Sequence, residues 1–433
     1  MRIRTGSIEL RSGHSAIPIR SRISLLSVVP IIAASIGMTF AAASNRADEA
    51  TPEPAFELDR TGTLQWLERS KTHKPRLPLP QPSEEDRQRG RTSPLGIVNN
   101  GLMRRFYLPK SWSSPASSGL AGNQGKVDST FKVELFWIAS RLNQCAYCLG
   151  HQEVKLSSAG LSEDAIANLD GDWSEADEPT RAARRLAVWK TVAPHRPVPK
   201  EILDALAKKY DQGQIDEILL AIANYNAMNR WTGPLNIPQE DHRTYSDRAN
   251  PKTAGKKSRL IDYAREVAGT KRELPSIDDW SAAVRPAAEV SPGKVESFLK
   301  NQGAFGEARL NSWKQAMTES TQEDAVPVEL RSRIFWICAR ADNASSAGAK
   351  ARAAALANGD SDDILRKIAE GAEDAAIPAS HRKALALAKK ITIRPGSVTD
   401  DDISEVSAAW GDRATAQIVE TACIAAAVNR CSH

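Results

Sequence analysis

The residues best suited to chemistry in this 433-residue chain lie close together, between Glu134 and His151. Cys145 and Cys148 form a C-x-x-C pair, and His151 follows the second cysteine by three residues. Residues three apart are neighbours on a helix, so the two sulfurs and the imidazole can share one surface. A peroxide can oxidise such a dithiol to a sulfenic acid, which then closes to a disulfide. The histidine can accept or deliver the protons of that cycle.

The expected position of the pair at the start of a helix would activate the thiols. Asn143 is a candidate N-cap, which places Cys145 and Cys148 in the first turns, where unpaired N–H groups and the helix dipole favour thiolate. Glu134 stands 11 residues before Cys145, or about 16 Å along one straight helix. We therefore expect Glu134 to reach the thiols only if the chain turns near Asn143 and Gln144 and two helices pack together.

Other interpretations of the C-x-x-C pair remain open. A structural zinc site needs four ligands, and this stretch supplies three. The cysteines could also form a structural disulfide or remain two buried thiols. A c-type haem attachment requires histidine directly after the second cysteine, whereas Leu149 and Gly150 intervene here. A thioredoxin-like domain requires a βαβ pattern, and the flanks of this motif are helical.

The stretch resembles the alkylhydroperoxidase D-like branch of the carboxymuconolactone decarboxylase-like superfamily. The resemblance rests on Glu134, Asn143, the run Cys145–Cys148, His151 and the segment N-Y-N-A-M-N-R at 224–230. In that family, the spacing from the acid to the first cysteine is one residue longer than here. The spacing from the second cysteine to the histidine is also one residue longer.

The resemblance implies a thiol-dependent peroxidase, an oxidoreductase that reduces alkyl or hydrogen peroxides through a Cys145–Cys148 disulfide. It implies that Cys148 attacks the peroxide, that Cys145 resolves the product, and that Glu134 and His151 relay protons. Neither an organic cofactor nor a metal is implied, because sulfur carries the electrons. The expected partners are a peroxide, an outside dithiol reductant and further copies of the chain in a homo-oligomer. The alternatives are a general thiol-disulfide oxidoreductase and a non-catalytic helical assembly module.

Apolar residues at spacings of three and four predict an all-α fold, because strand-type alternation is nearly absent. Several segments also recur at offsets of 199 or 200 residues: Phe136–Ile138 with Phe335–Ile337, Leu186–Ala187 with Leu385–Ala386, Lys190 with Lys389, and Asn229–Arg230 with Asn429–Arg430. Matches in this order predict a tandem duplication of the alkylhydroperoxidase D-like helical domain.

The second copy is expected to be degenerate. The offset of 199 places Ala344, Ala347 and Lys350 where the first copy has its two cysteines and its histidine, and Arg333 replaces the acid. We expect this copy to serve packing. The other three cysteines are expected to be structural: Cys338, Cys423 and Cys431.

The expected organisation has five parts: a signal peptide or membrane anchor over 1–47, a polar and Pro-rich segment over 48–94, the active domain over 95–237, a connector over 238–285, and the degenerate copy over 286–433. In the first part, arginines precede the apolar run Ile23–Phe40, and small residues follow, the pattern of an export signal. We therefore expect export to the periplasm or cell envelope, with membrane contact only if this segment stays uncleaved.

The charge distribution argues against nucleic-acid binding. The formal net charge is +5, and residues 1–47 account for all of it, so the rest of the chain sums to zero. A neutral surface with interspersed charges offers little attraction for a phosphate backbone. Nucleic acid is therefore not expected among the partners.

Overall fold

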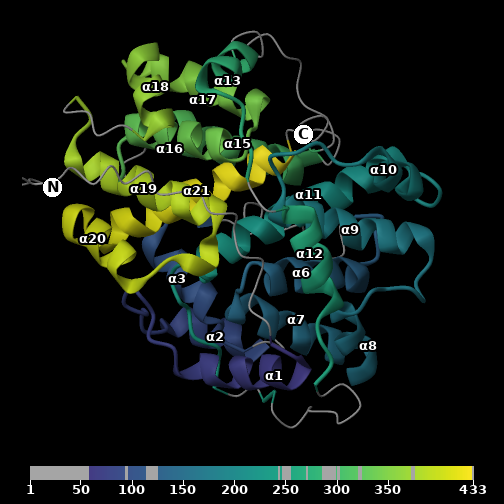
Figure 1. Ribbon diagram of the computed structural model, residues 1–433. Helices are drawn as coiled ribbons and strands as arrows, with labels where there is room; N and C mark the ends of the chain where they lie inside the picture. Colours follow the sequence, from purple (N-terminus) through teal and green to yellow (C-terminus); the bar gives the residue numbers. More distant parts are fainter. Residues whose placement is uncertain are drawn as a thin grey trace, which may run out of the picture. The chain divides into compact units, whose positions relative to one another are not determined.

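The computed structural model describes residues 58–92, 96–113, 125–241, 244–245, 255–269, 272–284, 299, 303–319, 324–371 and 376–431. Every regular element in these ranges is a helix, which confirms the predicted all-α fold (Figure 1). The expected leader over 1–47 lies outside the described residues. Within those residues, the search for a helix of membrane-spanning length and hydropathy finds none.

The first series of helices contains the cysteine pair and its surroundings. Its elements are α1 (Arg60–Arg69), η1 (Ser70–Thr72), α2 (Glu84–Thr92), α3 (Asn99–Tyr107), α4 (Lys110–Ser113), α6 (Ser129–Leu142), α7 (Ala146–Ser158), α8 (Glu163–Ala167), η2 (Asn168–Asp170), α9 (Glu178–Val192), α10 (Lys200–Leu206) and α11 (Gln212–Thr232). Side-chain caps fix several starts: Asp128 caps α6, Asp177 caps α9, and Asp211 with Gln214 forms a capping box on α11.

The second series has a similar order. Its elements are α12 (Arg259–Ala268), α13 (Ile277–Val284), α15 (Gly303–Thr318), α16 (Val328–Ala341), α17 (Ser345–Ala357), α18 (Asp362–Glu370), α19 (Ala379–Ile393), η5 (Pro395–Ser397), α20 (Asp400–Trp410) and α21 (Asp412–Cys431). We call residues 58–241 the first half and residues 255–431 the second half.

Helix lengths recur between the two halves. Helices α6 and α16 have 14 residues each, α7 and α17 have 13, α9 and α19 have 15, and α11 and α21 have 21 and 20. The turns between the first two helices of each set also correspond, because Gln144 and Asn343 both have positive φ, at 55° and 52°. Left-handed backbone is uncommon at residues other than glycine.

The helix positions correct part of the predicted register. Counted from the start of each helix, the match of Leu186–Ala187 is Leu387–Ala388, not Leu385–Ala386, and Lys190 corresponds to Ile391 rather than Lys389. The stretch between α17 and α19 is two residues longer than the stretch between α7 and α9. The sequence match at an offset of 199 was therefore two residues out of register in this helix.

Helices α11 and α21 lie side by side and make the most extensive contact in the described part of the chain (Figure 1). One apolar core is built mainly from α6, α9 and α11, and the other mainly from α16, α19 and α21. Cys145, Tyr147 and Cys148 pack in the second of these cores, although they come from the first half. The cysteine pair therefore lies where the two halves meet.

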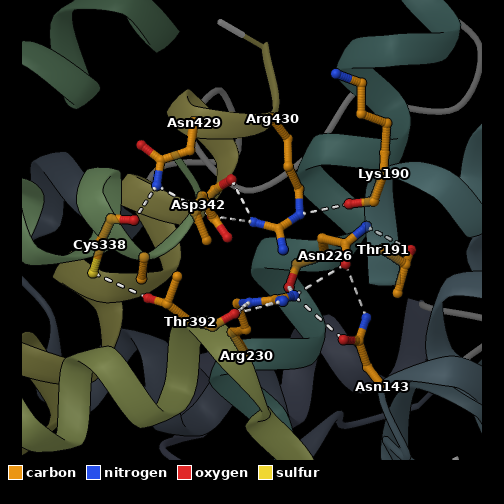
Figure 2. Close-up of polar contacts among 12 residues, drawn as sticks. Asn143, Lys190, Thr191, Asn226, Arg230, Cys338, Asp342, Thr392, Asn429 and Arg430 are labelled. Atoms are coloured by element: carbon orange, nitrogen blue, oxygen red, sulfur yellow. Dashed lines mark hydrogen bonds and ion pairs between the residues drawn. The ribbon is translucent and has the colours of Figure 1, made fainter. Parts of the chain in front are cut away.

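Two arginines cross this junction in corresponding ways (Figure 2). Arg230 of α11 donates to the backbone oxygen of Thr392 through Nε, at 3.3 Å, and Nη2, at 3.0 Å. Arg430 of α21 donates through Nε to the backbone oxygen of Lys190, at 3.0 Å. Thr392 and Lys190 lie in the last turns of α19 and α9, where carbonyls lack helical partners. Each arginine therefore caps a helix of the opposite half.

The surroundings of the two arginines differ by one carboxylate. Arg430 Nη1 lies 2.9 Å from Asp342 Oδ2, and both side chains are almost fully buried, at 1% and 0% exposed. The residue at the same place in the first half is Asn143, whose Oδ1 lies 3.4 Å from Arg230 Nη1. Burial opposes ionisation of Asp342, but Arg430 and Arg272 hold its pKa below the ordinary value. Asp342 therefore forms ion pairs with both Arg430 and Arg272.

Helix α7 is tied to the amino-terminal segment by a buried acid. Glu153 accepts from Arg60 Nη1 and Nη2 at 2.6 and 2.8 Å, and from Trp137 Nε1 at 2.6 Å. Arg60 lies on α1, within the segment over 48–94. Helix α1 is therefore packed on the helix that begins at the cysteine pair.

Candidate functional site

The cysteine pair lies at the turn between α6 and α7. Cys145 is the N-cap of α7, and its Sγ accepts a hydrogen bond from the backbone N–H of Cys148 at 3.3 Å. The predicted N-cap, Asn143, is instead the C-cap of α6. The predicted turn at Asn143 and Gln144 is confirmed, and α6 and α7 pack together after it.

Thr232, the last residue of α11, joins the two sulfurs. Its Oγ1 lies 3.0 Å from Cys145 Sγ and 2.9 Å from Cys148 Sγ, and it donates to the backbone oxygen of Met228 at 3.0 Å. A hydroxyl has one donor and two acceptor positions. It can therefore accept from both neutral thiols, or turn its proton toward a thiolate.

Both cysteines are reduced and buried, with 0% of Cys145 and 2% of Cys148 exposed. Burial opposes ionisation of both, yet hydrogen bonds from Cys148 and Thr232 lower the pKa of Cys145 below its ordinary value. Burial and the neighbouring Cys145 sulfur raise the pKa of Cys148 well above its ordinary value. The hydrogen bonds therefore favour Cys145 as the thiolate, whereas the family resemblance assigned the attack to Cys148.

His151 has a carboxylate partner that sequence reasoning missed. Its Nε2 lies 2.9 Å from Glu240 Oε2, and Tyr147 donates its hydroxyl to Glu240 Oε1 at 2.7 Å. The rings of Tyr147 and His151 also stack, with centroids 4.3 Å apart. Glu240 belongs to the stretch predicted as a connector, so its neighbourhood held no motif that pointed to the site. Tyr147 thus packs against His151 and also binds the same carboxylate.

Glu134 occupies a different place from the one expected. Its Oε2 lies 2.8 Å from Arg184 Nη2, in an ion pair that joins α6 to α9. Glu134 lies eight residues before Leu142, the last residue of α6. At 1.5 Å per residue this separation is about 12 Å along the helix. Glu134 therefore pairs with Arg184, and the acid paired with His151 is Glu240.

Amides from α11 hold the turn before Cys145. Asn143 Nδ2 donates to the backbone oxygen of Ala139 at 2.9 Å and to Asn226 Oδ1 at 3.0 Å. The same Asn226 oxygen accepts from Arg230 Nη1 at 3.0 Å. Figure 2 shows this chain of contacts running from the turn to the junction of the halves. Two residues of the 224–230 segment thus position the turn.

A pocket of about 210 Å³ opens beside the cysteine pair. Its wall includes both neighbours of Cys145, the threonine that joins the sulfurs, and a loop of the second half; the lining residues are Trp66, His73, Arg76, Gln144, Ala146, Tyr147, Thr232, Gly233, Asn236, Ile237, Pro395, Gly396 and Val398. The sulfurs themselves lie behind Thr232. We call this the junction pocket.

The zinc interpretation finds no ligand set in the described ranges, where no group of three or more His, Cys, Asp or Glu side chains is placed to hold a metal. His151 faces Glu240, and both sulfurs face a hydroxyl. These contacts suit proton transfer and sulfur chemistry.

Comparison with known proteins gives one distant similarity. No family model matches the chain. A protein of Bacillus subtilis (strain 168), described as uncharacterized protein YdfG, is 27% identical over 110 residues, which cover 25% of this chain and 74% of that protein. A segment of this chain thus resembles most of a smaller protein whose name states no activity.

Proposed function

We propose that this chain is a thiol-dependent peroxidase whose Cys145 and Cys148 cycle between a dithiol and a disulfide. The observation that carries the proposal is the pair of sulfurs within 3.0 and 2.9 Å of one threonine hydroxyl, with the pKa of Cys145 lowered. A thiolate beside a second thiol is the arrangement that oxidation to a disulfide requires.

The proposed reaction begins with attack of the Cys145 thiolate on one oxygen of ROOH. The O–O bond breaks, ROH leaves with the proton that Cys145 gave up, and Cys145 becomes a sulfenic acid. The Cys148 thiol then attacks this sulfur, the S–O bond breaks, and water leaves as the disulfide forms. Two electrons pass from the thiols to the peroxide. An outside dithiol restores the pair by exchange and becomes a disulfide itself.

We assign the proton carrier to His151. It lies one helical turn after Cys148 on α7, and its pairing with Glu240 supports a positive charge on the ring. Glu240 takes the part that the family resemblance implied for Glu134.

The burial of the sulfurs favours a peroxidase over an oxidoreductase acting on protein disulfides. Thiol-disulfide exchange requires direct contact between the attacking and attacked sulfurs. Sulfurs at 0% and 2% exposure beside a pocket of about 210 Å³ suit a small oxidant better than a folded protein.

We infer further that the chain is a tandem duplication of an alkylhydroperoxidase D-like domain with a degenerate second copy. Three observations support this: recurring helix lengths, positive φ at Gln144 and Asn343, and Ala344 as the N-cap of α17 where Cys145 caps α7. Export to the periplasm or cell envelope stays a proposal from residues 1–47 alone.

Mass spectrometry after one equivalent of alkyl hydroperoxide tests the proposed function. We expect a loss of two hydrogens at the Cys145–Cys148 pair. In Cys148→Ser, a sulfenic acid should persist on Cys145 and be trapped by dimedone; Cys145→Ser should trap none. Cys423→Ser, which removes another buried thiol, should behave like the unchanged protein. Slow, non-stoichiometric oxidation would contradict the peroxidase, and trapping only on Cys148 would contradict the order of attack.

A further inference from the structure

A loop of the second half reaches the cysteine turn of the first. A Cβ placed on Gly396 would lie 3.1 Å from Gln144 Cβ and 3.3 Å from the backbone oxygen of Asn143, tighter than most packed contacts. The loop Pro395–Val398 therefore rests on the residues just before Cys145 and forms one wall of the junction pocket.

The corresponding loop of the first half carries a large side chain at this point. The backbone oxygen of His195 accepts from Asn343 Nδ2 at 3.3 Å, and Asn343 is the counterpart of Gln144 in the other turn. Each loop follows the C-cap of a 15-residue helix and begins with proline, so His195 corresponds to Gly396. The loop that rests on the turn before Cys145 thus has glycine where its counterpart has histidine.

The lining of the junction pocket contains one fixed positive charge. Arg76 is the one lining residue whose charge is fixed near neutral pH, and the lining contains no acid. Burial and Arg76 lower the pKa of His73, so its ring is neutral there. Arg76 Nη1 donates to the backbone oxygen of Pro234 at 2.8 Å. Its Nε pairs with Asp400 Oδ1 at 2.7 Å, and Asp400, which is 84% exposed, lies outside the lining of the pocket.

We propose that the junction pocket binds an organic hydroperoxide that carries a carboxylate. The guanidinium of Arg76 anchors the carboxylate through Nη2 and its positive charge, because Nη1 and Nε already donate to Pro234 and Asp400. The absence of a side chain at Gly396 lets its loop rest on the cysteine turn, where a Cβ would meet Gln144 and Asn143. The pocket between this loop and Thr232 takes the organic group. The second half therefore sets which oxidants reach the thiols. This inference rests on the proposed peroxidase function.

The test compares three probes on the full-length chain: hydrogen peroxide, cumene hydroperoxide and cumene hydroperoxide with a 4-carboxylate. Stopped-flow measurement of disulfide formation should show the carboxylate probe reacting about tenfold faster than its neutral analogue, the gain of one charge-assisted contact. Arg76→Gln should abolish this preference, so that the ratio of the two organic rates falls to about one. Arg87→Gln, which alters an exposed arginine of α2, should keep the preference. Equal rates for the two organic probes in the unchanged protein would overturn the proposal.

A second pair of variants tests the glycine. Gly396→His should slow both organic probes about tenfold or more, because a side chain there would press on Gln144 and Asn143 and displace the loop that forms the pocket wall. Circular dichroism reports whether the fold is intact. His195→Gly, the matched change in the other loop, should alter none of the three rates. Unchanged organic rates in Gly396→His would overturn the role of the loop.

Binding without oxidation separates this proposal from the peroxidase itself. Calorimetry with 4-isopropylbenzoate should show binding that weakens about tenfold in Arg76→Gln. If this acid binds and no peroxide oxidises the cysteines, the peroxidase fails and the anion pocket stands. If peroxides oxidise the pair without preference and the acid does not bind, the pocket proposal fails alone.

Discussion

At the scale of single residues, the hydroxyl of Thr232 helps to set the pKa of a buried cysteine. Thr232 Oγ1 contacts both Cys145 and Cys148, and its hydrogen bonds help to lower the pKa of Cys145 despite complete burial. A lowered thiol pKa means that the thiolate appears at lower pH than in a free cysteine, so alkylation of Cys145 should begin at lower pH too.

Thr232→Val removes this hydroxyl and keeps the shape of the side chain. We expect the half-point for alkylation of Cys145 to rise by about one pH unit, because the loss of one hydrogen bond is worth about 1 kcal/mol and one pKa unit about 1.4 kcal/mol. Iodoacetamide labelling read by mass spectrometry across pH measures the shift. Thr415→Val, a buried change on α21, is the control. An unmoved half-point in Thr232→Val would contradict this role.

The two acids offer a second comparison. Glu240→Gln removes the carboxylate beside His151, and we expect the rate of oxidation by alkyl hydroperoxide to fall about tenfold or more, within the usual range for positioned proton transfer. Glu134→Gln alters the acid paired with Arg184 and should leave the rate close to that of the unchanged protein. The opposite ranking would restore Glu134 to the relay.

The proximity of the two cysteines and His151 could be predicted from sequence, because these residues lie within a few positions of one another. Glu240 could not, because it lies far along the chain in a stretch without periodicity, and only tertiary packing brings it to the imidazole. The choice of Asn143 as N-cap followed the usual preference for asparagine over cysteine at that position. The structure places a sulfur there, which then accepts the amide hydrogen bond that asparagine would have accepted.

At the scale of elements, the α6–α7 hairpin depends on a left-handed residue. Gln144 has φ of 55°, a conformation that costs side-chain-bearing residues about 1 kcal/mol or more and glycine little. Sequence periodicity predicted the helices and the turn. It could not predict this backbone conformation, because glutamine carries no preference for it.

Substitution at this turn should separate backbone strain from side-chain contacts. Gln144→Gly should keep or raise the free energy of unfolding, whereas Gln144→Val should lower it by about 1 kcal/mol or more, because β-branched residues tolerate positive φ poorly. Urea unfolding followed by circular dichroism measures both. Equal stability of the two variants would show that φ at residue 144 does not limit this hairpin.

At the scale of the whole molecule, the junction between α11 and α21 is a buried charge network around Asp342 (Figure 2). Helix existence and the Asn229–Arg230 match with Asn429–Arg430 were predictable, because long amphipathic helices and exact repeats are strong signals. The crossing of each arginine to the other half was not, because carbonyls at helix ends leave no mark on the sequence.

Asp342→Asn should destabilise the fold by about 3–5 kcal/mol, because it leaves buried Arg430 without its carboxylate. The pKa of Asp342 is lowered in the folded protein, so its contribution is complete above the ordinary carboxyl pKa and decreases as the pH falls below it. The free energy of unfolding, measured with denaturant, should therefore decrease less with falling pH in the variant than in the unchanged protein. Asp204→Asn, in an exposed pair with Lys200, should have little effect at any pH.

The loop Pro395–Val398 and the turn before Cys145 belong to one polypeptide. A cavity shared between separate chains is lost on dilution, because its integrity depends on protein concentration. Here the loop is tethered to the cysteine turn on which it rests, so its local concentration is fixed by the chain. The rate per molecule should be the same in nanomolar and micromolar solutions.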